Sequence, residues 1–264
     1  MMGLAILVQA CVLSAAPAGM PHARVTLVSE QTSIQPGATL RVGLRFELEK
    51  GWHIYWLNPG DSGEPPRVEW KLPAQFRAGP LEWPAPKRLE NGPLVDYGYE
   101  GEVLLTAAIR TPARPKPGGT VELQANVRWL VCHDACIPER QTVSLTLPVA
   151  RDAPTIDSRW RGLFAHTHSR LPKRAPSSWR VSAVSNPESF VLSIETGTQE
   201  STATFFPLVP LQIKDSAPQQ AAPLAQGIRL TLRKSDKLLR PVDSLRGIVV
   251  LGPDRAYSVN VRLD

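Results

Sequence analysis

Two cysteines, Cys132 and Cys136, are the residues of this chain best suited to chemistry. They lie in the segment Trp129-Leu-Val-Cys-His-Asp-Ala-Cys-Ile-Pro138. The Cα atoms of a disulfide are about 4.4–6.8 Å apart, a distance that four extended residues would exceed, so the chain must turn between the cysteines. His133-Asp-Ala135 can form that turn, directly after a strand that ends at Val131. The spacing therefore predicts a dithiol that can close into a disulfide.

Three uses of this pair are open on the residues alone. A disulfide across so short a loop removes only about 2 kcal/mol of unfolded-state entropy, against about 4.7 kcal/mol for a 100-residue loop, so it would be a poor staple. A redox-active pair needs a thiolate, which nearby cations stabilise, and Arg128 and His133 are near in sequence. A metal site could recruit His133 and Asp134, with copper the better ion for thiolate and imidazole, but the chain has no second cysteine cluster to complete a zinc site. These considerations favour redox activity over the other two uses.

The N-terminus is typical of an export signal. Residues 4–13 are mostly apolar, and Ala16-Pro-Ala18 follows as a small-residue cleavage site, which predicts a signal peptide over residues 1–18. No Lys or Arg precedes Arg24, which is atypical of a signal, and a disordered apolar tail is the alternative. Val8-Gln-Ala-Cys11 is a poor match to a lipoprotein cleavage site, which makes lipidation a weaker alternative. We expect a periplasmic protein whose remaining two cysteines lie in a disulfide-permissive compartment.

Composition restricts the class of protein. The 264 residues are 42% hydrophobic and 20% charged, as in soluble globular proteins. The 26 prolines favour short strands joined by loops, because proline is excluded from helix interiors and central strands. The net charge is only +6 and the basic residues are scattered along the sequence, which argues against nucleic-acid binding.

Alternating apolar residues predict strands in the first part of the chain. Residues 39–48 place Leu40 and every second residue through Leu48 on one face, the pattern of a half-buried strand. Further strands are predicted over residues 103–109, 121–131 and 142–149. The segment 59–86 is proline-rich and reads as irregular, and 111–119 reads as a turn. Short strands at this spacing, with no helical pattern between them, predict a β-sandwich.

The pattern changes near residue 157 and then returns to strands. Residues 157–168 predict one short helix, with Asp157 as its capping residue and an end at Leu171-Pro172. Residues 214–226 are predicted to form a flexible loop. We therefore expect an all-β chain of two β-sandwich domains joined by a short helix, with domains at 25–150 and 176–264 and a linker at 151–175. Strands are predicted in the second domain at residues 179–184, 190–194, 202–206, 227–232, 245–251 and 257–263.

Four ordered motifs together resemble a known family. They are Gly51-Trp-His-Ile-Tyr-Trp-Leu-Asn-Pro-Gly-Asp-Ser-Gly63, Leu81-Glu-Trp-Pro-Ala-Pro-Lys-Arg88, Tyr97-Gly-Tyr-Glu-Gly-Glu-Val103 and Trp129-Leu-Val-Cys-His-Asp-Ala-Cys-Ile-Pro-Glu139. The series is similar to the periplasmic N-terminal region of DsbD-type thiol:disulfide interchange proteins, most closely the branch that includes the copper-sensitivity suppressor proteins. The resemblance covers residues 25–150, and residues 155–264 are similar to the second β-domain of that longer branch.

The resemblance implies immunoglobulin-like sandwiches and a redox role. In the family, the cysteine pair takes electrons from a membrane-embedded donor by way of a thioredoxin-like domain and passes them to a periplasmic disulfide oxidoreductase. Carried over by motif, Cys132 and Cys136 are the redox pair of a protein-disulfide reductase-type activity, and Cys136 forms the mixed disulfide. We expect no cofactor, no bound metal and a monomer. The alternative is an Ig-like adaptor or copper-binding module whose cysteine pair is structural or ligates the metal.

The family also covers its cysteine pair with a loop until a partner arrives. The matching segment here is Val95-Asp-Tyr-Gly-Tyr99, in which Asp96 stands where the better-known loop has phenylalanine. A cap here would therefore depend on Tyr97 or Tyr99, and ordinary packing is the alternative for both rings.

Other residues are predicted to line the cysteine site. His53 and Tyr55 alternate along one strand, and His133 lies between the cysteines, so we expect all three beside the pair. Members of the family usually continue into a membrane domain and a thioredoxin-like domain. Because this chain stops at Asp264, we expect those parts to be separate polypeptides, or this chain to be a free-standing module whose electron donor the sequence does not identify.

Overall fold

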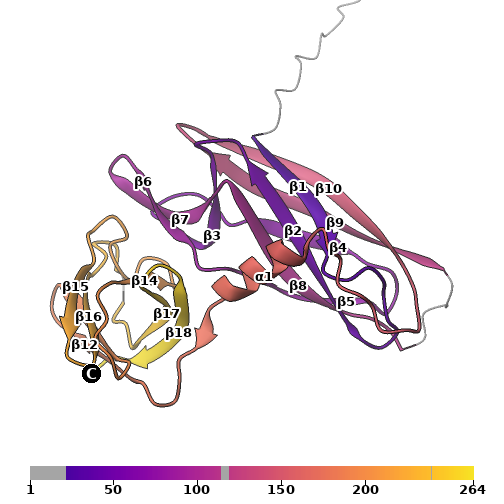
Figure 1. Cartoon of the computed structure of the whole chain (residues 1–264). Coiled ribbons are helices and arrows are strands. Elements are labelled where there is room, and N and C mark those ends of the chain that lie inside the picture. Colours follow the sequence, from indigo (N-terminus) through magenta and orange to yellow (C-terminus); the bar gives the residue numbers. More distant parts are fainter. Residues whose placement is uncertain (1–21, 114–118, 239) are drawn as a thin grey trace, which may run out of the picture.

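The computed structural model describes residues 22–113, 119–238 and 240–264, so the predicted signal peptide over residues 1–18 and Cys11 lie outside the described residues. Within these ranges the regular structure consists of β-strands and one helix, α1 (Arg161–Arg170) (Figure 1). The predicted all-β class is confirmed. None of the helical structure in these ranges is long and apolar enough to cross a membrane.

The first half of the chain forms two sheets that enclose one core. Its strands are β1 (Ala23–Ser29), β2 (Thr39–Leu48), β3 (His53–Gly60), β4 (Arg67–Lys71), β5 (Arg77–Glu82), β6 (Lys87–Asn91), β7 (Leu94–Glu100), β8 (Glu102–Arg110), β9 (Thr120–Cys132) and β10 (Cys136–Pro148). One sheet has the order β1-β2-β8-β5. The other has the order β10-β9-β3-β7-β6, with β4 paired to β9 alongside β3.

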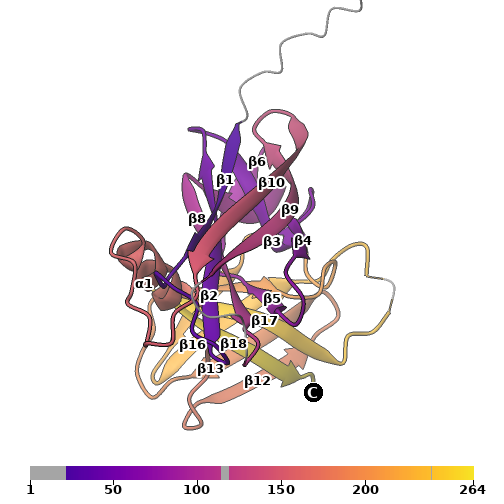
Figure 2. The same cartoon turned by 90° about the vertical axis from the view of Figure 1, so that its right-hand side faces the viewer.

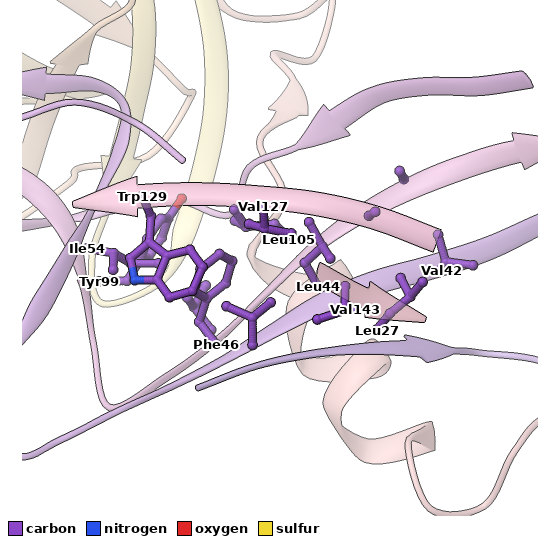
Figure 3. Packing of buried hydrophobic residues seen from close by; sticks show 14 of the residues in the cluster. Leu27, Val42, Leu44, Phe46, Ile54, Tyr99, Leu105, Val127, Trp129 and Val143 are labelled. Carbon is purple, nitrogen blue, oxygen red and sulfur yellow. The ribbon is translucent and has the colours of Figure 1, made fainter. Parts of the chain in front are cut away.

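Alternation along the strands explains how this core is filled. In β2, every second residue from Leu40 to Phe46 is buried, and Leu48 is partly buried against the same cluster, on the face that the sequence predicted. Phe46 meets Trp129 of the facing sheet edge to face, with ring centroids 5.6 Å apart. Figure 3 shows this pair beside Ile54. The core therefore lies between the two sheets. The face of the second sheet that points away from this core is its outer face.

Three strands lie wholly where the sequence predicted irregular chain. They are β4 and β5 within residues 59–86, and β15 (Gln220–Leu224) within residues 214–226. Pro80 lies in β5 and Pro223 in β15, and both of these strands are at the edges of their sheets, where the hydrogen bond that proline cannot donate is not needed. The three strands correct the predictions of an irregular segment at 59–86 and a flexible loop at 214–226.

Helix α1 covers one face of the first sheet. Its Phe164 is fully buried against Val28 and Leu104, and α1 lies beside β8 (Figure 1). The helix was predicted, but its capping residue was not predicted correctly. Trp160 occupies the N-cap position without a side-chain bond, while the Asp157 carboxylate accepts hydrogen bonds from Arg159 instead.

The second half of the chain forms two further sheets around a second core. The sheet orders are β11-β18-β17-β14 and β12-β13-β16-β15, and every strand predicted in this half is present. In β18, Val259 and Val261 are buried, as their alternation predicted. The remaining bounds are β11 (Lys173–Arg174), β12 (Arg180–Ser185), β13 (Ser189–Glu195), β14 (Ala203–Pro207), β16 (Gly227–Arg233), β17 (Ser244–Leu251) and β18 (Arg255–Arg262).

The two halves contact each other through β3 and β7. Phe206 of β14 packs edge to face against Trp56 and Tyr97, with ring centroids 6.2 and 5.1 Å apart, and belongs to the first core. The Asn58 amide donates a hydrogen bond of 2.8 Å to the carbonyl of Pro207. Figure 2 shows the strands of the second half below those of the first. Residues of the second half therefore complete the packing of β3, which pairs with β9 at Cys132, and of β7, the next strand in the sheet.

Candidate redox site

The cysteine pair closes the hairpin formed by β9 and β10. Cys132 is the last residue of β9 and Cys136 the first of β10, and the two stand directly opposite each other with their Cα atoms 4.2 Å apart. Their sulfurs form a disulfide. The predicted turn at residues 133–135 is present, and the His133 amide donates to the carbonyl of Ala135. The hairpin continues for thirteen paired positions beyond this turn, as far as the pair of Thr120 and Pro148.

The two cysteines differ in accessibility. Odd-numbered residues of β9 such as Trp129 and Val131 face the core, so Cys132 and its partner Cys136 lie on the outer face of the sheet. Cys132 has no exposed surface, whereas Cys136 is an exposed residue. Thiol-disulfide exchange requires a thiolate to reach a sulfur, so an incoming group meets Cys136 before Cys132.

Tyr55 of β3 covers the buried side of the disulfide. Its hydroxyl donates a hydrogen bond of 2.9 Å to Cys132 Sγ and lies 3.4 Å from Cys136 Sγ. His53 is the one residue of β3 in register with Cys132, and its ring meets that of Tyr55 edge to face at 5.2 Å. Alternation along β3 therefore brings both predicted lining residues to the outer face beside the cysteine pair.

Burial controls the protonation of these two side chains. Burial raises the pKa of Tyr55, against the opposing effect of a hydrogen bond from Ser62, so the phenol keeps its proton and can donate it to sulfur. Burial also lowers the pKa of His53, which outweighs the opposing influence of Asp96 and Glu100. His53 is therefore neutral at neutral pH. Its Nε2 lies 3.8 Å from Asp96 Oδ2, and neither atom has a hydrogen-bond partner among the described residues.

A short loop after β3 holds Tyr55 in place. Asp96 anchors the loop, because its Oδ1 accepts hydrogen bonds from the backbone amide and the hydroxyl of Ser62, at 3.0 and 2.9 Å. The loop is tied a second time where the Val95 amide donates to Asp61 Oδ2. Gly63, at a φ of +80°, lies so close to the Tyr55 ring that a Cβ atom there would overlap it. Residues 61–63 thus form the cover of Tyr55. The sequence did not reveal this role, although the motif at residues 51–63 includes them.

The placement of Tyr97 and Tyr99 in β7 differs from the predicted cap. Alternation places Asp96 on the outer face but turns Tyr97 and Tyr99 toward the core. The Tyr97 hydroxyl donates to Asp215 Oδ1 at 2.7 Å, and the Tyr99 hydroxyl donates to the carbonyl of Pro84 at 2.7 Å. Figure 3 shows Tyr99 among the side chains of the core. Neither tyrosine covers the disulfide in this structure, and burial raises the pKa of both hydroxyls above the usual tyrosine range.

His133 lies in the turn and is about half exposed. Its Nδ1 is 2.9 Å from Asp134 Oδ2, and its ring lies 5.8 Å from that of Trp52. The imidazole is therefore near the cysteine pair because His133 belongs to the turn that joins the two cysteines. Across residues 22–113, 119–238 and 240–264, no three His, Cys, Asp or Glu side chains come together in a way that could hold a metal ion.

A comparison with protein families identifies the first half of the chain. Residues 24–148 match the DsbD N-terminal family. The description of that family is thiol:disulfide interchange protein DsbD, N-terminal. The matched segment contains both cysteines, Tyr55 and the loop over it. No curated protein has a matching sequence.

Solved structures show what the fold of the whole chain is similar to. The N-terminal periplasmic domain of ScsB from Proteus mirabilis superposes with a TM-score of 0.70 at 17% identity, covering 94% of this chain and 96% of that one. Both halves of the chain therefore share its fold. A Porphyromonas gingivalis W83 protein of unknown function (11% identity, 92% of this chain and 100% of that one) and the periplasmic chaperone SfaE (12%, 90% and 98%) have TM-scores of only 0.25 and 0.22.

Proposed function

We propose that this protein is a periplasmic thiol-disulfide exchange protein that cycles Cys132 and Cys136 between dithiol and disulfide. The observation that carries the proposal is the asymmetry of the pair on the outer face of the sheet, with Cys136 exposed and Cys132 buried under Tyr55. The family match over residues 24–148 supports the same chemistry.

The hairpin itself argues against a purely structural disulfide. Thirteen paired positions hold β9 and β10 together from residue 120 to residue 148. Closing a loop of five residues at one end adds only about 2 kcal/mol in the chain-entropy model. The fold therefore needs the disulfide little, and reduction leaves the strands paired.

In the proposed direction the protein passes electrons to its partner, and the exchange proceeds in two steps. In the reduced protein, the Cys136 thiolate attacks one sulfur of a partner disulfide, forms a mixed disulfide and releases the partner's other sulfur as a thiolate. Cys132 then attacks Cys136 Sγ, which restores the Cys132–Cys136 disulfide and releases the second partner thiol. Two electrons pass to the partner, and the protein is left oxidised. A membrane-embedded or thioredoxin-like donor would return two electrons to it.

The second half of the chain takes no part in this chemistry. We propose domains at 25–150 and 176–264 with a linker at 151–175, in line with the two separate cores. The role of the second domain would be to pack against β3 and β7 through Phe206.

A single-cysteine variant tests the proposal. With Cys132→Ala, Cys136 should form a mixed disulfide with a partner and be unable to resolve it, so the adduct should accumulate and be identifiable by mass. Cys136→Ala is the matched control and should trap far less, because Cys132 is buried. Equilibration of the wild type with glutathione buffers should give a measurable reduction potential. A disulfide that neither glutathione nor thioredoxin reduces in the folded protein would refute the function.

A further inference from the structure

Three arginines that are far apart in the sequence form one row on the outer face of the cysteine sheet. Arg128 of β9 is in register with Arg67 of β4 on one side and with Arg140 of β10 on the other. All three are exposed residues. Paired residues on neighbouring strands have Cα atoms about 4.5–5.5 Å apart, so the Cα atoms of the three arginines span about 10 Å. We call these residues the arginine row.

Acidic neighbours offset little of the positive charge of the arginine row. Arg67 Nη2 is 3.7 Å from Glu64 Oε2, but both side chains are about two-thirds exposed, so the pair is weak. Within the described residues, neither Arg128 nor Arg140 forms an ion pair. Like charges directly opposite each other destabilise a sheet, so the free protein bears a cost that an acidic ligand would relieve.

Two further glutamates lie near the row, and each accepts a hydrogen bond from another group. Glu69 stands one pleat further along β4, where its carboxylate accepts a hydrogen bond from the Asn126 amide. Glu139 belongs to the opposite face of β10, and its Oε1 accepts a hydrogen bond from the backbone amide of His22. Neither carboxylate lies within ion-pair distance of an arginine of the row.

The arginine row is continuous with the cysteine site. Leu130 and Pro138, which are in register with each other, separate the row from the disulfide on the same face. A hollow of about 620 Å³ extends over Leu130, Pro138 and the row, and Glu64 and Glu139 are also in its lining. A second hollow of about 500 Å³, whose lining includes Glu69, continues past Arg128 and Arg140 toward Thr142. Arg140 is four residues from Cys136, which corresponds to about 13 Å along a strand.

We propose that this face docks an acidic segment of the partner protein whose cysteine reacts with Cys136. The inference rests on the proposed function and adds the chemistry by which the partner is recognised. A partner cysteine at Cys136 would bring residues four positions away over the arginine row, with apolar contact to Leu130 and Pro138 between them. Carboxylates at those positions would meet three guanidinium groups, whereas lysines would be repelled.

Synthetic peptides test the proposal without knowledge of the partner. The probes are disulfide-linked dimers of Cys-Gly-Ser-Gly-Asp-Asp-Asp and of the same peptide with three lysines. The protein is first reduced with dithiothreitol, the reagent is removed, and the rate at which each dimer oxidises the dithiol is measured. At low ionic strength the acidic dimer should react about 10-fold faster than the basic one, and the advantage should fall steeply in about 0.5 M salt.

Variants assign this preference to the row. The double variant Arg128→Gln with Arg140→Gln should lose most of the acidic preference, and Arg140→Glu should lose it as well. The matched control is Arg229→Gln, an exposed strand arginine of the second half, which should keep the wild-type ratio. Urea unfolding checks that each variant is folded. An unchanged ratio in the row variants, or the same loss in the control, overturns the docking surface while the exchange function stands. Failure of every dimer to oxidise the wild-type dithiol overturns both.

Discussion

Replacement of Gly63 by alanine should disturb the cover of the disulfide without touching either cysteine. Gly63 has a φ of +80°, and a Cβ atom there would overlap the Tyr55 ring at the carbon that bears the hydroxyl. That hydroxyl contacts both sulfurs. Either the loop or the ring must therefore move, and both movements loosen the contact between Tyr55 and the disulfide.

Two terms set the expected loss of stability. Alanine in the left-handed region costs about 1–2 kcal/mol, and overpacking of a filled interior costs about 1–3 kcal/mol more. Gly101 is the matched control, because it has a φ of +69° and nothing within 4 Å of its added Cβ atom. Gly63→Ala should therefore lower the free energy of unfolding by about 2–5 kcal/mol, and Gly101→Ala by only about 1–2 kcal/mol.

Urea unfolding of the oxidised proteins measures the first effect, and the rate of disulfide reduction by dithiothreitol measures the second. Gly63→Ala should be reduced faster than the wild type, because Cys132 loses its cover, while Gly101→Ala should be reduced at the wild-type rate. Equal losses of stability and equal reduction rates in the two variants would refute the placement of residues 61–63 over Tyr55.

Two further variants test the electrostatics of the site and of the contact between the halves. Tyr55→Phe removes a donor that stabilises a thiolate more than a disulfide, so the reduction potential should become more negative by about 20–30 mV in glutathione buffers, and an unchanged potential would contradict the contact. Burial raises the pKa of Asp215 from 3.8 to about 6. The folded state therefore favours the protonated carboxyl, and its contribution to stability, present below pH 4, is lost as the pH rises through 6. Asp215→Asn should gain up to about 3 kcal/mol of stability over the wild type between about pH 4 and pH 7 in urea unfolding, and parallel pH profiles would contradict this.

The sequence predicted the parts of the fold that depend on alternation and on local turns. The buried face of β2 and the turn between the cysteines follow from residue types at fixed spacing. Two strands with prolines, β5 and β15, were missed, because a sequence does not show which strands will lie at the edge of a sheet. Pro80 would break a central strand but is tolerated in β5.

The candidate site was predicted less completely than the fold. A cap formed by Tyr97 or Tyr99 was predicted because residues 95–99 match the cap loop of the family. Alternation along β7 turns both rings toward the core, and β7 was not among the predicted strands. The arginine row could not be predicted at all. Its members are on three strands, and only the register of β4, β9 and β10 brings them together.

The same alternation links the second half of the chain to the cysteine site. In β3, Tyr55 faces the disulfide and the next residue, Trp56, packs against Phe206. In β7, Asp96 anchors the loop over Tyr55 and the next residue, Tyr97, donates to Asp215. Each strand therefore carries residues of the site on one face and residues of the contact with the second half on the other. Packing on one face restricts the backbone that positions the other, so we expect the second half to help hold the cover of the disulfide in place, although the hydrogen bonds to the sulfurs come from Tyr55 of the first half.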